Sequence, residues 1–492
     1  MKTVHPFKTR TACAALIAAA VLAACAVGPD FVRPAAPDIE RYAREPLLAS
    51  TVAADQQAQR FTPGAAVAAD WWKLFNSYAL DATVRQALAN NPTLQAAEAN
   101  LRQSQDNLRA GYGVFFPQIT AEGAATRQRS APIQQGSAAP GSVFNLFTLS
   151  GIINYAIDVF GGSRRRVEGR RAQADDLRYA SKAAYITLSA NVVNTSIARA
   201  AYDAQVRATE QLIALEQQQL QTTEAQVRTG FAPYANLLSL RGLIAANQAA
   251  LAPLKQKRDQ SEHLLATLEG VPPSQVTLPD IELTTLALPL ELPVSLPSDL
   301  VRQRPDILSA EAQLHVASAN IGVATAAMFP SFSLNGSYGA AGSTPAALSS
   351  GNGNFWNIGP AVSAPVFRGG SLWYGRQAAL DAYAASQAVY RQTVLDAFAQ
   401  VADTLDALAH DAEALQAQSA AQRAAAEALQ LLQANYRAGL AAYLDVLAAD
   451  VQYHVATIAY LQAVAQRHQD TVALFVALGG GWWTAPTPPA AQ

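Results

Sequence analysis

The chain has few of the residues that build metal and redox sites. Its only two cysteines, Cys13 and Cys25, lie near the N-terminus, so the rest of the chain has no disulfide framework and no cysteine-type zinc site. The six histidines show no metal-ligand spacing. The sequence also lacks a nucleophile elbow, a phosphate-binding loop and a supported pair of carboxylates. We therefore predict that the protein is not an enzyme and needs no metal or other cofactor.

An excess of charge of one sign is also absent. The 35 Lys and Arg residues nearly balance the 37 Asp and Glu residues, which gives a formal net charge of −2. This balance gives no reason to expect a nucleic acid as a partner. The mean hydropathy is only +0.06 although 50% of the residues are hydrophobic. Much of that half is alanine, which strongly favours helix formation.

The N-terminus has the organisation of a bacterial export signal. Basic residues between Lys2 and Arg10 precede an apolar segment that is too short to span a membrane as a helix. This segment ends in Leu22-Ala23-Ala24-Cys25, which resembles the lipobox of bacterial lipoproteins. The resemblance implies cleavage before Cys25 and lipidation of that cysteine. An ordinary signal peptide with an incidental cysteine is the alternative.

The residue after Cys25 bears on sorting. It is Ala26, and not the Asp that often marks lipoproteins retained in the inner membrane. The resemblance therefore implies an outer-membrane location. Several acyl chains on Cys25 would give stable anchoring where a single chain would not.

The remaining chain contains an internal repeat. Landmarks recur in the same order about 210 residues apart, which indicates a duplicated unit. The matched landmarks are Pro92, Glu98 and Pro117 with Pro305, Glu311 and Pro330; Phe160-Gly161-Gly162 with Phe367-Arg368-Gly369-Gly370; Arg228-Thr229-Gly230 with Arg437-Ala438-Gly439; and Leu268-Glu269-Gly270 with Leu478-Gly479-Gly480. We place one copy at residues 75–270 and the other at residues 296–481.

The segments outside the two copies have a different composition. Residues 271–295 contain several prolines, cannot form a regular helix and are predicted to be an extended connector. Residues 25–74 are rich in Pro and Ala and are predicted to form a tether on the surface. Residues 1–24 are the predicted signal peptide, and residues 482–492 form a C-terminal tail.

Each copy contains a predicted helix of unusual length. Arg376–Ala438 contains neither Gly nor Pro, and Ser163–Thr229 contains no Pro and one Gly. At about 1.5 Å per residue each would span roughly 95–100 Å, whereas helices in globular proteins average about 10–14 residues. Apolar steps of three and four, as in Leu237, Leu240 and Ile244, predict coiled-coil packing. A stack of separate shorter helices is the alternative.

Two predicted strands interrupt the helices in each copy. Apolar and polar residues alternate in four segments, as in half-buried strands and membrane barrels. The segments are Ile119–Ala125, Phe147–Asp158, Phe332–Tyr338 and Trp356–Val366. Four strands cannot close a barrel, and open edges in a bilayer leave backbone groups unpaired at several kcal/mol each. If these strands cross a membrane, at least two chains must share one barrel, because bacterial barrels begin at eight strands.

Five further motifs are distributed along the chain after the signal, and the resemblance that they carry covers nearly all of it. They are Cys25-Ala26-Val27-Gly28-Pro29-Asp30-Phe31, Asp70-Trp71-Trp72-Lys73-Leu74-Phe75, Asp158-Val159-Phe160-Gly161, Tyr436-Arg437-Ala438-Gly439-Leu440 and Ala477-Leu478-Gly479-Gly480-Gly481-Trp482. Together they resemble the TolC-like outer-membrane factor family, in particular its NodT-type efflux lipoproteins. The resemblance implies a mixed α and β fold. In it, very long coiled-coil helices form a periplasmic α-barrel, and four strands per chain contribute to the shared β-barrel of a homotrimer.

The resemblance also implies a function. The protein would be the outer-membrane exit duct of a tripartite efflux system, passively conducting small toxic compounds or drugs out of a Gram-negative cell. Its partners would be a periplasmic adaptor (membrane fusion) protein, an inner-membrane pump and outer-membrane lipid. The alternatives are the export duct of a type I secretion system and a structural coiled-coil envelope lipoprotein. The duplicated strand pairs disfavour the latter, because a stalk does not need them.

Candidate site residues follow from the same resemblance. The periplasmic tip that would contact the adaptor comprises Arg228, Gly230, Arg437, Gly439 and Leu440. Both glycines also fit plain turns between helices. Asp445 and Tyr436 are candidate gate residues, because the family closes its tip with hydrogen bonds and acidic rings. Asp445 also fits the first turn of a helix, Tyr436 also fits a packing position, and the first copy has the uncharged Asn236 where the second has Asp445.

Two charged clusters have less specific interpretations. Arg164-Arg165-Arg166 lies at a helix start, where positive charge is disfavoured. It is predicted to be a solvated face, with pore lining or contact with lipid headgroups as alternatives. His410, Asp411 and Glu413 are predicted to lie on an exposed helix face.

Overall fold

The structure, a computed structural model, describes residues 26–130 and 140–484. The predicted signal, Cys25, part of the first hairpin loop and most of the C-terminal tail lie outside the described residues. The chain divides into two compact units. The first, called the sheet unit, comprises the chain up to residue 34 with residues 101–177 and 310–390; the second, called the arm unit, comprises residues 35–100, 178–309 and 391–492.

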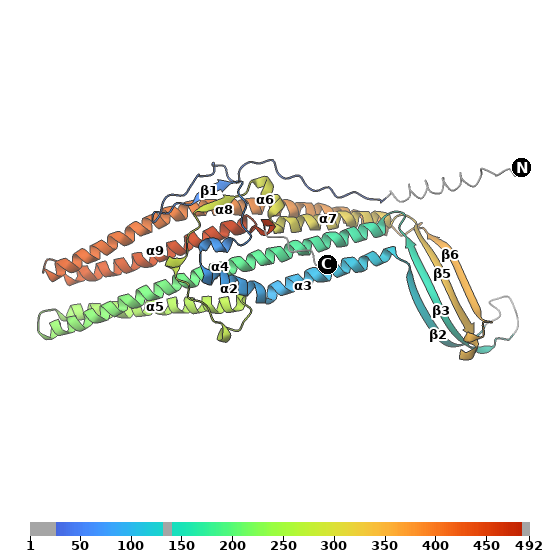
Figure 1. Cartoon of the computed structure of the whole chain (residues 1–492), viewed down its shortest axis with the longest axis horizontal. Coiled ribbons are helices and arrows are strands. Elements are labelled where there is room, and N and C mark those ends of the chain that lie inside the picture. The colour runs from blue at the N-terminus through green and yellow to red at the C-terminus, as the bar shows by residue number, and fades with distance from the viewer. Residues whose placement is uncertain (1–25, 131–139, 485–492) are drawn as a thin grey trace. The chain divides into compact units, whose positions relative to one another are not determined.

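Two very long helices dominate the chain. Helices α4 (Gly162–Arg228) and α8 (Ser371–Arg437) each have 67 residues (Figure 1). Each is followed by a returning helix of 35 residues, α5 (Tyr234–Leu268) or α9 (Tyr443–Ala477). The predicted long helices are confirmed, and the alternative of separate shorter helices is wrong. Stretches almost free of Gly and Pro allow this length, because nothing interrupts the backbone hydrogen bonds.

Shorter helices precede the strands in each copy. They are α2 (Tyr78–Asn90), α3 (Pro92–Gly111), α6 (Pro297–Gln303) and α7 (Pro305–Ala326). Three of them begin with Pro, whose missing N–H is not needed at the first helical position. The Asn91 side chain accepts a hydrogen bond from Leu94 N at 3.0 Å, which caps the start of α3. Thus Asn91-Pro92 separates α2 from α3.

Short 3₁₀ turns connect these elements. They are η1 (Trp71–Phe75), η2 (Tyr112–Phe115), η4 (Pro273–Gln275), η5 (Leu283–Thr285), η6 (Pro345–Ser349) and η7 (Trp482–Thr484). The Asp70–Phe75 motif of the family resemblance therefore forms a 3₁₀ turn, which α2 follows. Trp71 and Phe75 of this turn are fully buried in the arm unit, where Trp71 stacks on Phe475 of α9 at 5.4 Å between ring centroids.

The sheet unit contains one antiparallel sheet of four strands. In spatial order these are β2 (Gln118–Arg129), β3 (Val143–Ile157), β5 (Ser331–Gly342) and β6 (Asn354–Ser363) (Figure 1). The strand pair of the first copy joins that of the second through β3 and β5, where Ile153 lies opposite Gly336. The sheet therefore unites the two copies of the repeat.

The predicted surface tether is wrong for its buried residues, and the predicted extended connector contains a strand. In the arm unit, β1 (Arg60–Pro63) and β4 (Glu291–Val294) form a parallel pair between them. Phe61 and Leu292 are buried at this pair, and the connector also contains two of the short 3₁₀ turns. Four-residue strands are too short to show an alternating pattern, and Pro293 lowers the strand propensity further. Burial here depends on pairing between segments far apart in the chain.

Candidate functional site

The sheet has one apolar face and one polar face. In the strand register, the row Ile119, Ile153, Gly336 and Ile358 is apolar, and the next row, Gln118, Asn154, Asn335 and Gly359, is polar or glycine. The apolar face continues through Leu149, Tyr155, Phe332, Leu334, Tyr338, Trp356 and Val362, and the polar face through Thr120, Glu122, Ser150, Ser331, Ser333, Ser337, Asn357 and Ser363. Such alternation is typical of a wall between lipid and water.

The apolar face is exposed. Ile119 is 75% exposed and Ile358 is 68% exposed. Contiguous exposed apolar side chains mark surfaces that contact a protein or a membrane. The sheet also has two open edges, because β2 pairs only with β3, and β6 only with β5, among the described residues. In a bilayer these edges require strands from other chains.

Exposed aromatic residues flank the sheet. Near its helix-linked end they are Phe116, Phe367, Trp373 and Tyr374, and toward its opposite end they are Tyr338 and Trp356. Aromatic girdles lie at both interfaces of membrane barrels. Sequence reasoning missed this feature, although aromatic residues at both ends of alternating segments were a readable signal.

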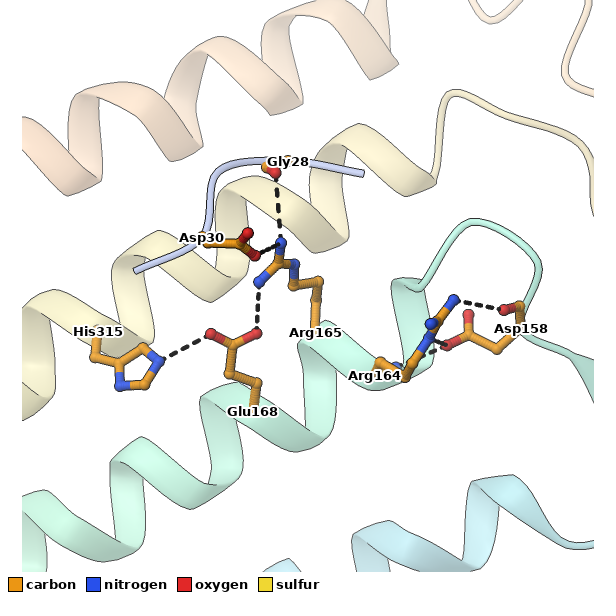
Figure 2. A network of polar contacts seen from close by, with 7 residues as sticks. All are labelled: Gly28, Asp30, Asp158, Arg164, Arg165, Glu168 and His315. Atoms are coloured by element: carbon orange, nitrogen blue, oxygen red, sulfur yellow. Dashed lines mark hydrogen bonds and ion pairs between the residues drawn. The ribbon is translucent and has the colours of Figure 1, made fainter. Parts of the chain in front are cut away.

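The N-terminal segment is fixed to the first strand–helix junction (Figure 2). The Arg165 side chain is 6% exposed and donates hydrogen bonds to Asp30 at 2.6 Å and to Glu168 at 2.8 Å. Burial disfavours the charged guanidinium, but the hydrogen bonds to Glu168 and Asp30 outweigh it and raise the pKa of Arg165. Glu168 also contacts His315 of α7 at 2.9 Å.

Close backbone contacts support this attachment. Val27 N donates to Phe160 O at 3.0 Å, and Phe31 stacks on His315 at 4.2 Å. Gly28 has a φ of +97°, and a Cβ there would lie 2.5 Å from the Cα of Gly322. Only glycine fits this position, because both the left-handed backbone and the close approach exclude a side chain.

The predicted solvated arginine face is wrong for two of its three residues. Arg165 is buried, and Arg164 contacts the Asp158 carboxylate at 3.4 Å (Figure 2). Asp158 also accepts hydrogen bonds from the backbone N–H groups at the start of α4, which offsets the positive charge placed there. Arg166 is exposed, as predicted. The partner Asp30 lies 135 residues away in the chain, so local sequence could not reveal it.

The predicted tip glycines lie at tight turns. Gly230 and Gly439 have φ of +79° and +75°. Leu440 N donates to Asn435 O at 2.8 Å and Gly439 N to Tyr436 O at 3.0 Å, which is a Schellman motif, and the first copy repeats it after α4. The turn interpretation is confirmed. Arg228 and Arg437 are the last residues of α4 and α8, where positive charge is favourable.

The two candidate gate residues make local contacts. The Asp445 carboxylate accepts a hydrogen bond from Ala442 N at 3.1 Å, which fits a residue in the first turn of α9. Tyr436 lies 5.4 Å from Tyr443 and packs against the cluster of Leu240, Ile244 and Tyr443. The packing interpretation of Tyr436 is confirmed. A gating role for either residue stays a prediction.

The predicted exposed face on α8 is wrong for Asp411. His410 and Glu413 are exposed, but Asp411 is half-buried, and one of its carboxylate oxygens is buried without a hydrogen bond. Burial, together with the nearby Asp470 of α9, raises the pKa of Asp411 to about 7. Successive residues on a helix point about 100° apart, so neighbours in sequence need not share a surface.

Helix α5 has an ambiguous composition. It is the one helix among residues 26–130 and 140–484 that is long and apolar enough to cross a membrane. Its polar contacts with α4 include Arg241–Glu224, Asn247–Glu216, Lys255–Glu210, Arg258–Asp203 and Glu262–Arg199. Charged pairs spread along the helix belong in water, so α5 is the returning helix of a hairpin with α4.

Comparison with known proteins identifies the family. The model of the outer membrane efflux protein family matches residues 83–271 and 296–480. The chain belongs to this family. The family confirms the predicted efflux function and outer-membrane location.

Individual relatives cover almost the whole chain. The probable efflux pump outer membrane protein TtgC of Pseudomonas putida is 28% identical over 482 residues, 96% of each chain. The cation efflux system protein CusC of Escherichia coli is 27% identical over 482 residues, 97% of this chain and 99% of the relative. The pyoverdine export outer membrane protein OpmQ of Pseudomonas putida is 30% identical over 416 residues, 84% of this chain and 88% of the relative.

Solved structures agree with the fold. The outer-membrane channel OprN has a TM-score of 0.82 at 27% identity, covering 93% of this chain and 100% of that chain. The CmeC outer membrane channel of Campylobacter jejuni also has a TM-score of 0.82, at 19% identity, covering 94% of this chain and 96% of that chain. Both are channel structures, and at that identity CmeC supports the fold alone. The prediction that this efflux protein has no catalytic activity stays a prediction.

Proposed function

We propose that this chain forms the exit duct of a tripartite efflux system as a homotrimer. The observation that carries the proposal is the sheet with one exposed apolar face, one polar face and two open edges. Three chains would pair β2 of one with β6 of the next and close a barrel of twelve strands. Closure pairs the backbone groups of every edge strand. The alternating side chains then place the apolar face toward lipid and the polar face toward a water-filled interior.

The long helices would form the periplasmic part of the duct. Helices α4 and α8 are interrupted by neither Pro nor strands, and each has a returning partner, so three chains would supply a closed tube. The path is passive: the pump supplies the energy, and this protein supplies a sealed, gated conduit. Neither a catalytic group nor a cofactor enters the proposal.

Lipidation of Cys25 would anchor the chain beside the barrel. The hydrogen bond from Val27 to Phe160 holds the start of the described chain next to the end of β3. A lipid on the preceding residues would therefore enter the membrane where the strands do. The lipid on Cys25 and the end of the strands would therefore lie at the same depth in the membrane.

We propose that the two tips contact the periplasmic adaptor. Each tip exposes an apolar residue directly after its glycine: Phe231 is 87% exposed and Leu440 is 79% exposed. Arg228 and Arg437 lie beside them, so each turn presents one exposed apolar side chain next to a positively charged side chain. In the same trimer, the three Asp445 carboxylates would form one ring that attracts cations.

The transported compounds would be small toxic compounds or drugs. The names of relatives refer to an antibiotic, to toluene, to pyoverdine and to cations. The polar face of the sheet is mostly Ser, Thr, Asn and Gln. Uncharged polar side chains select weakly between solutes, which suits a shared duct whose specificity is set by the pump.

Reconstitution of the purified protein in planar bilayers tests the duct. We expect discrete conductance steps. Ile358→Arg places a charge on the apolar face, which should cost about 2–4 kcal/mol per chain near the bilayer midplane and abolish insertion. The matched variant Asn357→Arg lies on the polar face, so it should insert and change the conductance. Insertion of Ile358→Arg with failure of Asn357→Arg would reverse the assignment of the two faces.

A further inference from the structure

A cavity lies at the helix-linked end of the sheet, within the sheet unit. Its volume is about 420 Å³, and its walls come from the end of β3, the start of α4, the end of α7, the start of β5, the end of β6 and the β6–α8 connection. One wall is aromatic. Phe160 stacks on Phe329 at 4.6 Å between ring centroids and lies 6.4 Å from Phe332.

Two arginines line the same cavity. Arg166 and Arg368 are both exposed, and the structure shows neither guanidinium in an ion pair or side-chain hydrogen bond with a described residue. Asp158 also lines the cavity, but its carboxylate already accepts hydrogen bonds from Ser163, Arg164 and the Arg164 side chain. The cavity therefore combines an apolar wall with two available positive charges.

The aromatic wall continues the apolar face of the sheet. Phe332 lies opposite Ile157 on one side and Val362 on the other, at the start of β5. If the strands cross the outer membrane, as proposed above, this point lies at the boundary between the periplasm-facing leaflet and water. Phosphate groups of lipids lie at this boundary, with their acyl chains on the membrane side.

We infer that this cavity binds an anionic glycerophospholipid, with its phosphate on Arg166 and Arg368 and its acyl chains against Phe160, Phe329 and Phe332. Guanidinium groups bind phosphate through charge-assisted hydrogen bonds in a geometry that lysine cannot match. This inference rests on the proposed function, because it requires the strands to lie in a membrane.

Charge complementarity selects this occupant over the chain's own anchor. The N-terminal segment passes close to the cavity, because Val27 N donates a hydrogen bond to the carbonyl oxygen of Phe160, which lines it. An acylated cysteine, however, would bring apolar chains without an anion, and the two guanidinium groups would remain unpaired. A phospholipid would pair its phosphate with the two arginines and pack its acyl chains against the aromatic wall.

Native mass spectrometry of the detergent-extracted protein, titrated with dioleoyl phosphatidylglycerol, tests the inference. We expect one lipid bound per chain and weaker binding of dioleoyl phosphatidylcholine, whose chains are identical but whose headgroup has no net charge. The double variant Arg166→Gln/Arg368→Gln should weaken phosphatidylglycerol binding at least about tenfold, because two charge-assisted contacts are lost. Arg171→Gln/Arg391→Gln removes two exposed arginines outside the cavity and should leave binding unchanged.

Three results would overturn the inference. They are equal lipid binding by the two double variants, displacement of the lipid by excess inorganic phosphate, and lipid binding that appears only after Cys25→Ser removes the anchor. The second result would indicate a site for free phosphate, and the third a cavity filled by the anchor. If the oligomer and its conductance persist while lipid binding fails, the inference fails and the proposed duct stands; loss of both in the wild type would refute the duct itself.

Discussion

The two copies of the repeat differ where a strand passes into a long helix. In the first copy, Phe160-Gly161-Gly162 leads into α4, which begins with three arginines. In the second, Phe367-Arg368-Gly369-Gly370 leads into α8, which begins with Ser371-Leu372-Trp373-Tyr374. Gly161 and Gly369 both have positive φ, but Gly370 also has positive φ whereas Gly162 is the first residue of α4, so the two turns share one left-handed glycine and differ in length and in their side chains.

The difference follows from what covers each junction. Arg165 is buried beneath the N-terminal segment and bound to Asp30, whereas Trp373, at the matching position, is 59% exposed. A buried arginine is stable only with its carboxylate partners. An exposed tryptophan is favourable at a membrane interface. Each junction therefore has the side chains that suit its own surroundings.

The helical hairpins of the two copies, α4 with α5 and α8 with α9, also differ in their charged residues. In the first copy, Arg241 of α5 pairs with Glu224 at the surface. In the second, α9 has Asp450 at the matching position, and burial raises its pKa to about 6. Together with Asp411 of α8, the α8–α9 hairpin therefore contains two carboxyl groups with raised pKa values.

The largest effect is expected from Arg165→Ala. The change removes the cation that Glu168 and Asp30 share. Breaking a buried ion pair is strongly destabilising. Because Asp30 itself is largely exposed, we expect a loss of about 3 kcal/mol in the free energy of unfolding, the low end of the range for buried pairs. Residues 26–34 should then become susceptible to protease, as followed by limited proteolysis and mass spectrometry. Arg166→Ala is the control and should leave the segment protected. Equal protection in both variants would contradict the role given to Arg165.

The second prediction concerns the pH dependence of stability that Asp411 of α8 causes. The pKa of Asp411 is higher in the folded than in the unfolded chain, so the folded state binds more protons between about pH 4 and 7, and stability falls as pH rises through about 7. Asp411→Asn should therefore raise the melting temperature relative to wild type at pH 8, with the difference shrinking at pH 5.5. Thermal unfolding followed by circular dichroism measures this.

The neighbouring variant Glu413→Gln serves as the control for Asp411→Asn. Glu413 is exposed, so its substitution should change the melting temperature little at either pH. A difference between wild type and Asp411→Asn that is the same at both pH values would show that the Asp411 carboxyl does not titrate in this range.

A smaller effect is expected from Trp373→Ala. The side chain is exposed, so unfolding in detergent should change by no more than about 0.5 kcal/mol. In lipid nanodiscs the variant should be less stable than wild type, because an interfacial aromatic anchor is lost. The comparison of thermal unfolding in the two environments is the measurement. A large loss in detergent would place Trp373 in a protein contact instead.

The smallest energetic effect is expected from Asp445→Asn, which gives the second copy the residue type that the first has at Asn236. Asparagine keeps an oxygen that can accept the Ala442 N–H, so unfolding should change by less than the roughly 0.3–1 kcal/mol that a helix-end charge contributes. If Asp445 belongs to the gate, cation selectivity should fall. Reversal potentials in a salt gradient measure it, and identical values would remove Asp445 from the gate.

Local patterns predicted the parts of the structure that depend on neighbours in sequence. The stretch without Gly or Pro predicted α8, alternation predicted β5, and the glycines at 230 and 439 predicted the turns, since each feature restricts its own backbone. The partner of Arg165 and the burial of Asp411 were not predictable, because both depend on segments that meet only in the folded chain. The pairing of β1 with β4 has the same origin.

The central claim is that several chains share one barrel. Native mass measurement after gentle detergent extraction tests it most directly. The open edges of β2 and β6 require strands from at least one other chain, and the proposed homotrimer predicts an assembly of three chains. A stable, folded monomer in detergent, with those edges unpaired, would contradict the account.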